Sequence, residues 1–340
     1  MRLTPICFAI LGATLLPAQT LRIGTLDFYG LHKVTESQVR KALGAKEGDA
    51  VPASKGDAED RIDRITGIVQ SHLEVVCCDG NQMILYVGIE ERGAPHFELR
   101  EAPTSDLHLP EEVSSVYRQF LDRFQTAGRR GIGDEDLTQG HSLLADPATR
   151  AVQEMFPSVA DQHLAEIRAV LRSAADEAER SAAAYVIGYA TKKSAIVDDL
   201  QFALKDPDAG VRDSAARNLM ALSVLQRLHP DSGVKVVPTW FIEMLNSLSW
   251  SDRDRALRAL AVLTESRDAS TMEQLRTRAL DSLVEMARWK TLRYALPAYL
   301  LVGRTAGVPE TELLAQWQQG DRETAIKKAT LPSPKLRISK

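Results

Sequence analysis

An excess of basic charge is the first feature that this 340-residue sequence lacks. It has 42 lysines and arginines and 46 acidic residues, which gives a formal net charge of -4 at pH 7. A protein with this balance has no general electrostatic attraction for nucleic acid or for an anionic membrane surface. After residue 20 the chain also lacks any apolar run of about 18 residues, the length that a transmembrane helix needs. The sequence therefore predicts neither a nucleic-acid partner nor a transmembrane segment.

Catalytic motifs are missing as well. No Gly-x-Ser-x-Gly, His-Glu-x-x-His, Walker or paired Cys-x-x-Cys pattern occurs. The stretch GRRGIG at 128–133 follows no predicted strand and precedes no Lys-Ser or Lys-Thr pair, which excludes a phosphate-binding loop. His141, Ser142 and Asp146 are close in sequence, but a polar turn between helices is the simpler interpretation. We therefore predict no catalytic, cofactor-binding or metal-binding residues and no enzymatic activity.

Cysteine is scarce, with only Cys7, Cys77 and Cys78 in the chain. Consecutive Cα atoms lie about 3.8 Å apart, less than a usual disulfide spans, and neighbours on a strand point to opposite faces. We therefore expect that Cys77 and Cys78 do not bond to each other. The histidines show no paired spacing around them that would indicate a metal site.

The N-terminus has the layout of a secretory signal peptide. Arg2 supplies a positive charge, an apolar stretch runs from Ile6 to Leu16, and the small residue Ala18 precedes a polar one. The apolar stretch is too short to span a bilayer about 30 Å thick. The sequence predicts a signal peptide at 1–18 and an exported protein, located in the periplasm or at the periphery of the outer membrane.

The segment 19–93 has the pattern of a small α+β unit. Alternating apolar residues predict a strand that ends at Gly30. Thr35 and Gln38 form a capping box for a helix that stops at Gly44. A second helix and two strands joined by an Asp-Gly turn follow, at 57–73, 73–78 and 83–90.

This unit resembles a polypeptide-transport-associated (POTRA) domain in the stretches FYGLHKVTESQVRKAL, KEGDAV and YVGIEER. The resemblance implies an exported module that binds other polypeptides, often by adding a strand to a sheet edge. It places the strand 73–78 at that edge, where the partner-binding residues would be Val75, Val76, Cys77 and Cys78. Alternation would turn the odd-numbered residues toward the helices and Glu74, Val76 and Cys78 outward.

A repeat follows a predicted helical connector at 94–157, which has a short strand at 97–99 and a helix that begins near Pro110. Aligning VRDSAARNLMAL with DRDRALRALAVL, and extending both ways, pairs four arginines separated by 32, 41 and 40 residues: Arg180, Arg212, Arg253 and Arg293. An amphipathic helix precedes each arginine-bearing helix. The residues placed to cap these second helices are Asp176, Asp208 and Ser249, whereas Trp289 breaks the series. Two helices per unit at this period indicate an α-solenoid at 158–320.

The stretch FALKDPDAGVRDSAARNLMAL resembles a HEAT repeat, of the kind that is similar to the repeats of bilin lyases. In that family the turn acids and helix arginines stack between neighbouring units. The resemblance implies that the four arginines form a structural ladder rather than an anion site. It also leaves an alternative function open, that of an enzyme or enzyme-accessory subunit related to HEAT-like lyases.

A solenoid offers its concave face to a partner. Tyr185, Arg217 and Arg258, each five residues after a ladder arginine, are expected to form a strip there for an acidic protein partner. The basic segment 321–340 is predicted to be a flexible tail. These patterns predict a multidomain fold, a POTRA-like β-α-α-β-β domain (α+β) followed by an all-α HEAT-type solenoid. The predicted function is that of an exported, non-catalytic scaffold of the bacterial cell envelope, with a structural stabiliser of a larger complex as another interpretation and the homo-oligomeric state left open.

Overall fold

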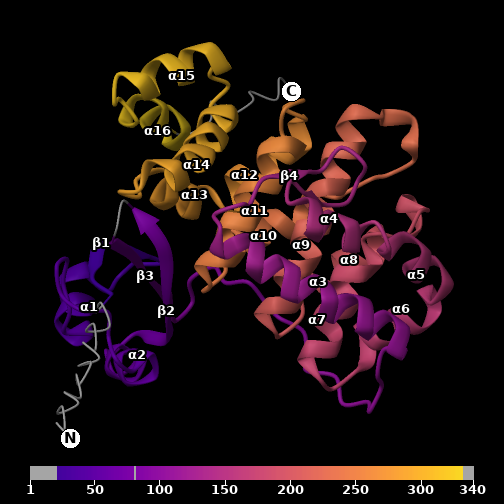
Figure 1. The fold of residues 1–340 in the computed structure, drawn as a ribbon. Coiled ribbons are helices and arrows are strands. Elements are labelled where there is room, and N and C mark those ends of the chain that lie inside the picture. Colours follow the sequence, from indigo (N-terminus) through magenta and orange to yellow (C-terminus); the bar gives the residue numbers. More distant parts are fainter. Residues whose placement is uncertain (1–20, 80–81, 332–340) are drawn as a thin grey trace, which may run out of the picture.

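The computed structural model describes residues 21–79 and 82–331, so the predicted signal peptide at 1–18 lies outside the described residues. A small three-stranded sheet forms near the N-terminus, and the rest of the described chain is mostly helical (Figure 1). This coarse arrangement is the predicted one. None of the helices within these residues is both long and apolar enough to cross a membrane.

The strand order of the sheet is β1-β3-β2. β1 (Ile23–Tyr29) runs parallel to β3 (Gln82–Glu91), and β2 (Ile68–Asp79) runs antiparallel to it. Helices α1 (Glu36–Leu43) and α2 (Lys55–Asp63) lie between β1 and β2 in the chain and pack on one face of the sheet. The order of elements matches the prediction, and β1 and β2 form the two edges.

Local signals set the ends of α1. The side chains of Thr35 and Gln38 each bond to the other's backbone N–H, which is the predicted capping box. Gly44 ends the helix at a φ of 69°, a left-handed conformation that glycine adopts without steric cost.

The second helix is shorter than predicted. It ends at Asp63, and β2 begins at Ile68, directly after Gly67 with a φ of 103°. The apolar residues from 62 to 73 have helical spacing, but pairing with β3 satisfies the backbone of 68–79 and buries Leu73 under the helices. Residues 68–73 were therefore assigned to the wrong kind of element.

The two faces of the sheet bury different side chains. Leu26, Leu73 and Leu85 lie beneath α1 and α2. Tyr29 and Tyr86 belong to the opposite face and pack into the core of the helical part. The sheet is therefore covered on one side by its own helices and on the other by helices from the C-terminal half.

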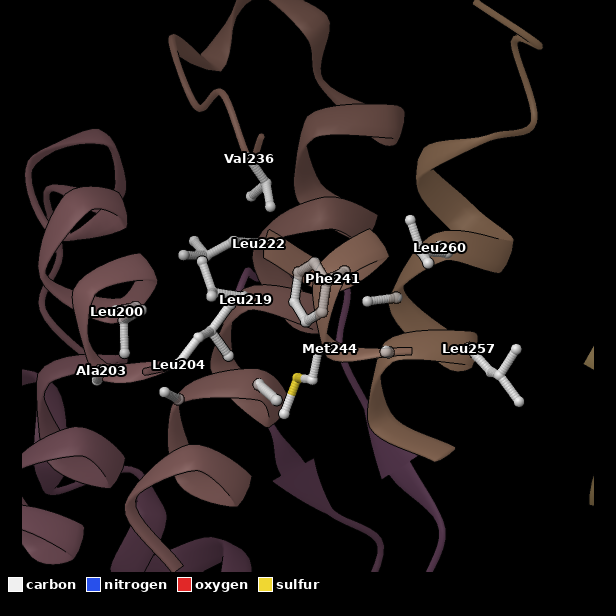
Figure 2. Packing of buried hydrophobic residues seen from close by; sticks show 14 of the residues in the cluster. Leu200, Ala203, Leu204, Leu219, Leu222, Val236, Phe241, Met244, Leu257 and Leu260 are labelled. Carbon is white, nitrogen blue, oxygen red and sulfur yellow. The ribbon is translucent and has the colours of Figure 1, made fainter. Parts of the chain in front are cut away.

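The helices after the connector pack in successive pairs, α6 with α7, α8 with α9, α10 with α11 and α13 with α14. Their bounds, with those of α12 and two short 3-10 helices, are α6 (Leu164–Ser173), α7 (Glu177–Ile187), η1 (Lys193–Ala195), α8 (Val197–Ala203), α9 (Ala209–Leu228), η2 (Pro230–Ser232), α10 (Thr239–Met244), α11 (Trp250–Leu263), α12 (Ala269–Arg278), α13 (Leu280–Ala287) and α14 (Leu292–Thr305). Second helices of neighbouring pairs also contact one another, α7 with α9, α9 with α11 and α11 with α14. Figure 2 shows the apolar layer between these pairs, with Leu200, Leu219, Phe241 and Leu260.

The connector folds back onto the helical pairs. α3 (Glu111–Arg129) begins directly after Pro110, as predicted, and contacts α7, whereas no strand forms at 97–99. The remaining connector elements are β4 (Glu135–Asp136), β5 (Leu143–Leu144), α4 (Pro147–Gln153) and α5 (Phe156–Gln162).

The prediction of a flexible tail at 321–340 is wrong for the residues that the structure describes. α16 (Glu323–Thr330) follows α15 (Glu310–Gln318) and packs on α14. Its buried residues are Ala325, Ile326 and Ala329. These side chains give the segment an apolar face that its basic composition conceals. Residues 332–340 lie outside the described part of the chain.

Candidate functional site

Two of the four predicted ladder arginines connect neighbouring helix pairs. Nη1 of Arg212 donates to the backbone oxygens of Asp206 and Pro207 at 2.8 and 2.9 Å. Its Nε lies 3.0 Å from both carboxylate oxygens of Asp252 on α11. Arg180 is bonded in the same way to the carboxylate of Asp206 and to two backbone oxygens of its own turn. Both guanidinium groups are buried, and their role is to join one helix pair to the next.

The third arginine, Arg253, meets the sheet. Its Nε donates to the backbone oxygen of Ser247 at 2.6 Å, and its guanidinium carbon lies 4.4 Å from the centroid of the Tyr29 ring. Its Nη1 is 3.9 Å from Glu285, a carboxylate that also accepts from the backbone N–H of Gly30 at 3.0 Å. Arg253 therefore meets an acid of the next helix pair, as Arg180 and Arg212 do, and also contacts Tyr29 at the end of β1.

The two positions at which the repeat loses its capping acid are both contacts with the sheet. Ser249 makes no side-chain cap for α11, and its Oγ donates to Glu74 on β2 at 3.0 Å. Trp289 is buried against Tyr29 and Tyr86, with ring centroids 6.0 and 4.9 Å away. The predicted caps in the earlier helix pairs do form: Asp176 and Asp208.

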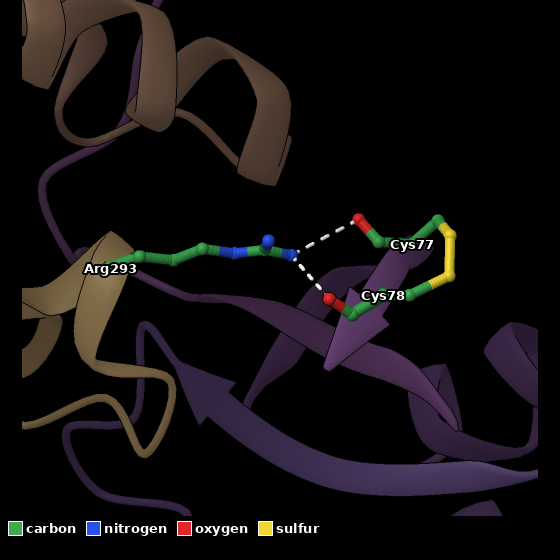
Figure 3. The surroundings of a disulfide bond; sticks show 3 residues. All are labelled: Cys77, Cys78 and Arg293. Atoms are coloured by element: carbon green, nitrogen blue, oxygen red, sulfur yellow. Dashed lines mark hydrogen bonds between the residues drawn. A yellow bond between two sulfur atoms is a disulfide. The ribbon is translucent and has the colours of Figure 1, made fainter. Parts of the chain in front are cut away.

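The fourth arginine was wrongly assigned to the ladder. Arg293 is exposed, and its Nη2 donates to the backbone oxygens of Cys77 and Cys78 at 3.2 and 2.7 Å (Figure 3). Arg180 and Arg212 bond to an acid of the next helix pair, whereas the guanidinium of Arg293 bonds to the end of β2.

The predicted binding strip on the concave face is largely covered by the connector. Tyr185 is only 5% exposed, stacks on Phe120 of α3 at 4.5 Å, and bonds through its hydroxyl to Gln153. Arg217 is half-buried and paired with Glu135. The prediction that these two residues face a partner is therefore wrong, because α3 and the β4 region fill the space. The third strip residue, Arg258, is exposed and bonded to Asp254 at 2.8 Å.

The polar residues near 140 do not converge on one another. Nδ1 of His141 lies 3.0 Å from the Lys193 ammonium, and Ser142 donates to Glu135 at 2.8 Å. Asp146 caps α4. Burial, with the Lys193 charge second, lowers the pKa of His141 to about 4, so its ring is neutral at pH 7. The arrangement is a buried support for the connector rather than a nucleophile with its base.

The outer side of β2 has backbone groups that the sheet does not use. The N–H of Leu73 points away from β3 and donates to a carboxylate oxygen of Glu59 on α2 at 2.6 Å. In an antiparallel ladder the residue two positions on faces the same way, so the N–H and C=O of Val75 also point outward. No described residue bonds to them, and Val75 is 40% exposed. The opposite edge of the sheet is different, because residues 48–51 pair with the start of β1.

The face of β2 that was predicted to be outward is covered by the helical part. Glu74 bonds to Ser249, and Val76 packs against the main core. Cys78 is half-buried, and Cys77 rather than Cys78 is the exposed member of the pair. Of the residues predicted to face α1 and α2, Leu73 does so, whereas Val75 is partly exposed at the edge.

Cys77 and Cys78 form a disulfide, contrary to the prediction (Figure 3). The pairing of β2 with β3 is irregular between Val76 and Asp79, and neither cysteine has a partner in the ladder. Because they stand in this irregularity, the two residues are not held to the opposite-face geometry of a regular strand. The expectation failed because it assumed an unbroken strand.

Two cavities lie along β2, one beside Val75 and the other beside Gln70 and His72. One, of about 250 Å³, lies on the side of α1 and α2 and is lined mainly by Val51, Pro52, Leu73, Val75 and Leu85. The other, of about 300 Å³, lies between the strand and the helical part. Its lining includes Gln70, His72, Glu90, Phe97 and Leu99. An outward backbone pair with a cavity on either face is the arrangement that strand addition uses.

No protein-family model matches this chain, and no curated protein matches its sequence.

The POTRA resemblance placed this strand at the sheet edge, but sequence reasoning missed the groups around it. Glu59 and Lys55 lie on an otherwise ordinary charged helix, and nothing in their spacing indicates contact with β2. Glu90 follows a buried strand and has no local motif. Only the pairing of distant segments brings these residues together.

Proposed function

We propose that this protein is an exported, non-catalytic interaction protein of the bacterial cell envelope, which binds an extended segment of another polypeptide along β2. The observation that carries the proposal is the outward N–H and C=O of Val75, which are unpaired beside one cavity, with a second cavity further along the same strand. A partner strand would supply the missing carbonyl and amide and place alternate side chains in the cavities. Glu59 already holds an acceptor oxygen against the N–H of Leu73, in the position that a partner carbonyl would take.

Two features favour export. The N-terminal pattern at 1–18 is that of a signal peptide. Disulfides such as Cys77–Cys78 persist in oxidising compartments and are rare in the cytosol. The resemblance of the sheet unit to a POTRA domain agrees with both, since members of that family are exported.

The helical part, with its HEAT-type resemblance, is proposed to act as the support for the sheet. Lys290 donates to Asp27 through its backbone N–H at 3.0 Å and to the backbone oxygen of Leu26 through its ammonium at 2.6 Å. Together with the aromatic contacts of Trp289, these bonds fix β1 and β3 from behind. A rigid sheet loses little conformational entropy when a strand is added to it, which favours binding.

The test uses the full mature chain and a nine-residue peptide that alternates valine with threonine. Val75→Pro removes the outward amide but leaves the bonds to β3 intact, because proline is tolerated on the open side of an edge strand. We expect this variant to lose at least about tenfold in peptide affinity, measured by calorimetry, with an unchanged circular dichroism spectrum. Val75→Thr keeps the amide and the β-branched shape and is the matched control.

Two further binding measurements, one with a protein variant and one with a modified peptide, complete the test. Glu59→Ala frees the N–H of Leu73, so the peptide should bind this variant more tightly than the wild type. A peptide N-methylated on alternate residues along its pairing edge should not bind. Unchanged affinity of Val75→Pro, or no binding of any peptide to the wild type, would overturn the proposal.

A further inference from the structure

We infer that the edge of β2 selects an extended segment with an apolar side chain on the α2 side and a cationic side chain on the opposite side. The inference rests on the proposed strand addition and names the chemistry of the segment. An added strand points successive side chains to opposite faces, so a partner residue beside Val75 would enter the first cavity, and one beside His72 or Gln70, three to five residues along, would enter the second.

The cavity on the α2 side is suited to an aliphatic side chain. Leu73 and Leu85 form its floor, and Val75 and Val51 form its walls. Filling it with an aliphatic side chain would bury apolar surface, whereas a charged side chain placed there would lose its hydration. Lys55 and Glu59 at the rim pair with each other at 3.6 Å.

The cavity on the opposite side has an excess of carboxylate. Glu90 lines it and makes no ion pair with any described residue. Glu74 and Glu59 approach the ring of the lining residue His72 to 3.8 and 3.5 Å. Burial, with the charge of Lys55 second, lowers the pKa of His72, so the ring is uncharged at pH 7.

The one permanent cation in the lining is not available to neutralise these carboxylates. Arg212 is buried and its guanidinium is occupied by Asp252 and by two backbone oxygens. Lys55 is already shared between Glu59 and His72. A lysine or arginine side chain from the partner would therefore meet an uncompensated carboxylate at Glu90, and an acidic side chain would be repelled.

Three peptides test the inference. They share the alternating valine and threonine sequence, and one threonine that faces the opposite side is replaced by lysine or glutamate or left unchanged. We expect the lysine peptide to bind the wild type at least about tenfold more tightly than the glutamate peptide at low salt, with the difference narrowing at high salt. Glu90→Gln should reduce this preference to within about threefold. Glu111→Gln changes the net charge equally, on an exposed residue of α3, and should leave the preference unchanged.

The outcomes separate the two hypotheses. If all three peptides bind equally, and all are weakened by Val75→Pro, strand addition stands and the charge selectivity is wrong. If the preference for lysine persists in Glu90→Gln, the cation is not recognised in this cavity. If no peptide binds the wild type, the proposed function itself fails.

Discussion

The guanidinium of Arg253 lies over the ring of Tyr29, and the hydroxyl of the same tyrosine donates to the backbone oxygen of Leu248 at 2.8 Å. This contact joins the third arginine of the helical series to the first strand of the chain. Arg253 therefore helps to hold the sheet against the helices.

Tyr29→Phe removes the hydroxyl and leaves the partly buried carbonyl of Leu248 without this donor. We expect it to lower the free energy of unfolding by about 1 to 2 kcal/mol in a urea titration. Tyr294→Phe is the control, because the hydroxyl of Tyr294 makes no hydrogen bond with any described residue, and it should cost under about 0.5 kcal/mol. Equal losses would contradict the assigned role of the Tyr29 hydroxyl.

Arg212→Ala strands the carboxylate of Asp252 and two backbone oxygens in the interior. The expected loss is about 3 to 5 kcal/mol, the range for breaking a buried ion pair from one side. The control is Arg258→Ala, whose guanidinium is 46% exposed and whose loss should cost under about 0.5 kcal/mol. Arg217 is not a suitable control, because it is half-buried and paired with Glu135. Thermal and urea melts that rank the two variants equally would refute the ladder role.

Gly88 lies where β3 passes the helical part. A Cβ atom added there would be 2.4 Å from the backbone oxygen of Leu248, so Gly88→Ala must push the sheet away from the helices. We expect a loss of about 2 kcal/mol or more, seen as a lower melting temperature. Gly56→Ala in α2 has open space around its added Cβ and should be neutral or slightly stabilising. A tolerated Gly88→Ala would mean that the sheet is not held this closely.

Glu91 makes the stability depend on pH in the acid range. Burial alone would raise its pKa, but bonds from the backbone N–H groups of His32, Val34 and Lys33 outweigh burial, and the net pKa lies below the ordinary 4.5. Its contribution is therefore fully present above pH 4.5 and is lost as the pH falls through the lowered pKa. We expect the wild type to lose stability more steeply than Glu91→Gln on acidification below about pH 5. Parallel curves for the two proteins would show that this carboxylate carries no such effect.

The Cys77–Cys78 disulfide predicts a thiol count. Mature protein isolated without reductant should react with no thiol reagent at these positions when denatured, and with two equivalents after treatment with a dithiol. Mass spectrometry of the peptide that contains both residues should show a gain of two hydrogens on reduction. Two free thiols in the untreated protein would mean that Cys77 and Cys78 are not bonded to each other.

Features that depend on residues close in sequence were predictable, whereas features that depend on contacts between distant segments were not. The caps at Thr35, Asp176 and Asp208 each depend on residues within one helical turn, and all three form as predicted. The start of β2 was missed because the apolar spacing from Ile62 to Leu73 suits a helix, and only pairing with β3 decides otherwise.

The same difference between nearby and distant residues applies to the candidate site. The POTRA resemblance placed the strand 73–78 at a sheet edge, whereas alternation along that strand turned Val75 toward the helices, and the structure leaves Val75 partly exposed. The covering of Tyr185 by α3 and the capture of Arg293 by the end of β2 depend on contacts between distant segments. Ser249 and Trp289 depart from the acidic residue of the earlier repeats. The structure gives the reason, because both residues contact the sheet, Ser249 through Glu74 and Trp289 through Tyr86.

The docking of Tyr29 and Tyr86 on Trp289 has a consequence for the order of folding. The sheet comes first in the chain, and its strands and the helices α1 and α2 are complete by Glu91. Its aromatic face must then wait for nearly two hundred further residues before the helices that cover it exist. During that interval the sheet exposes two tyrosines and an apolar surface to other chains. Because contacts between segments this far apart in the chain form slowly, we expect the packing of α13 and α14 on the sheet to be the last step of folding. The chain should depend on chaperones mainly before that step.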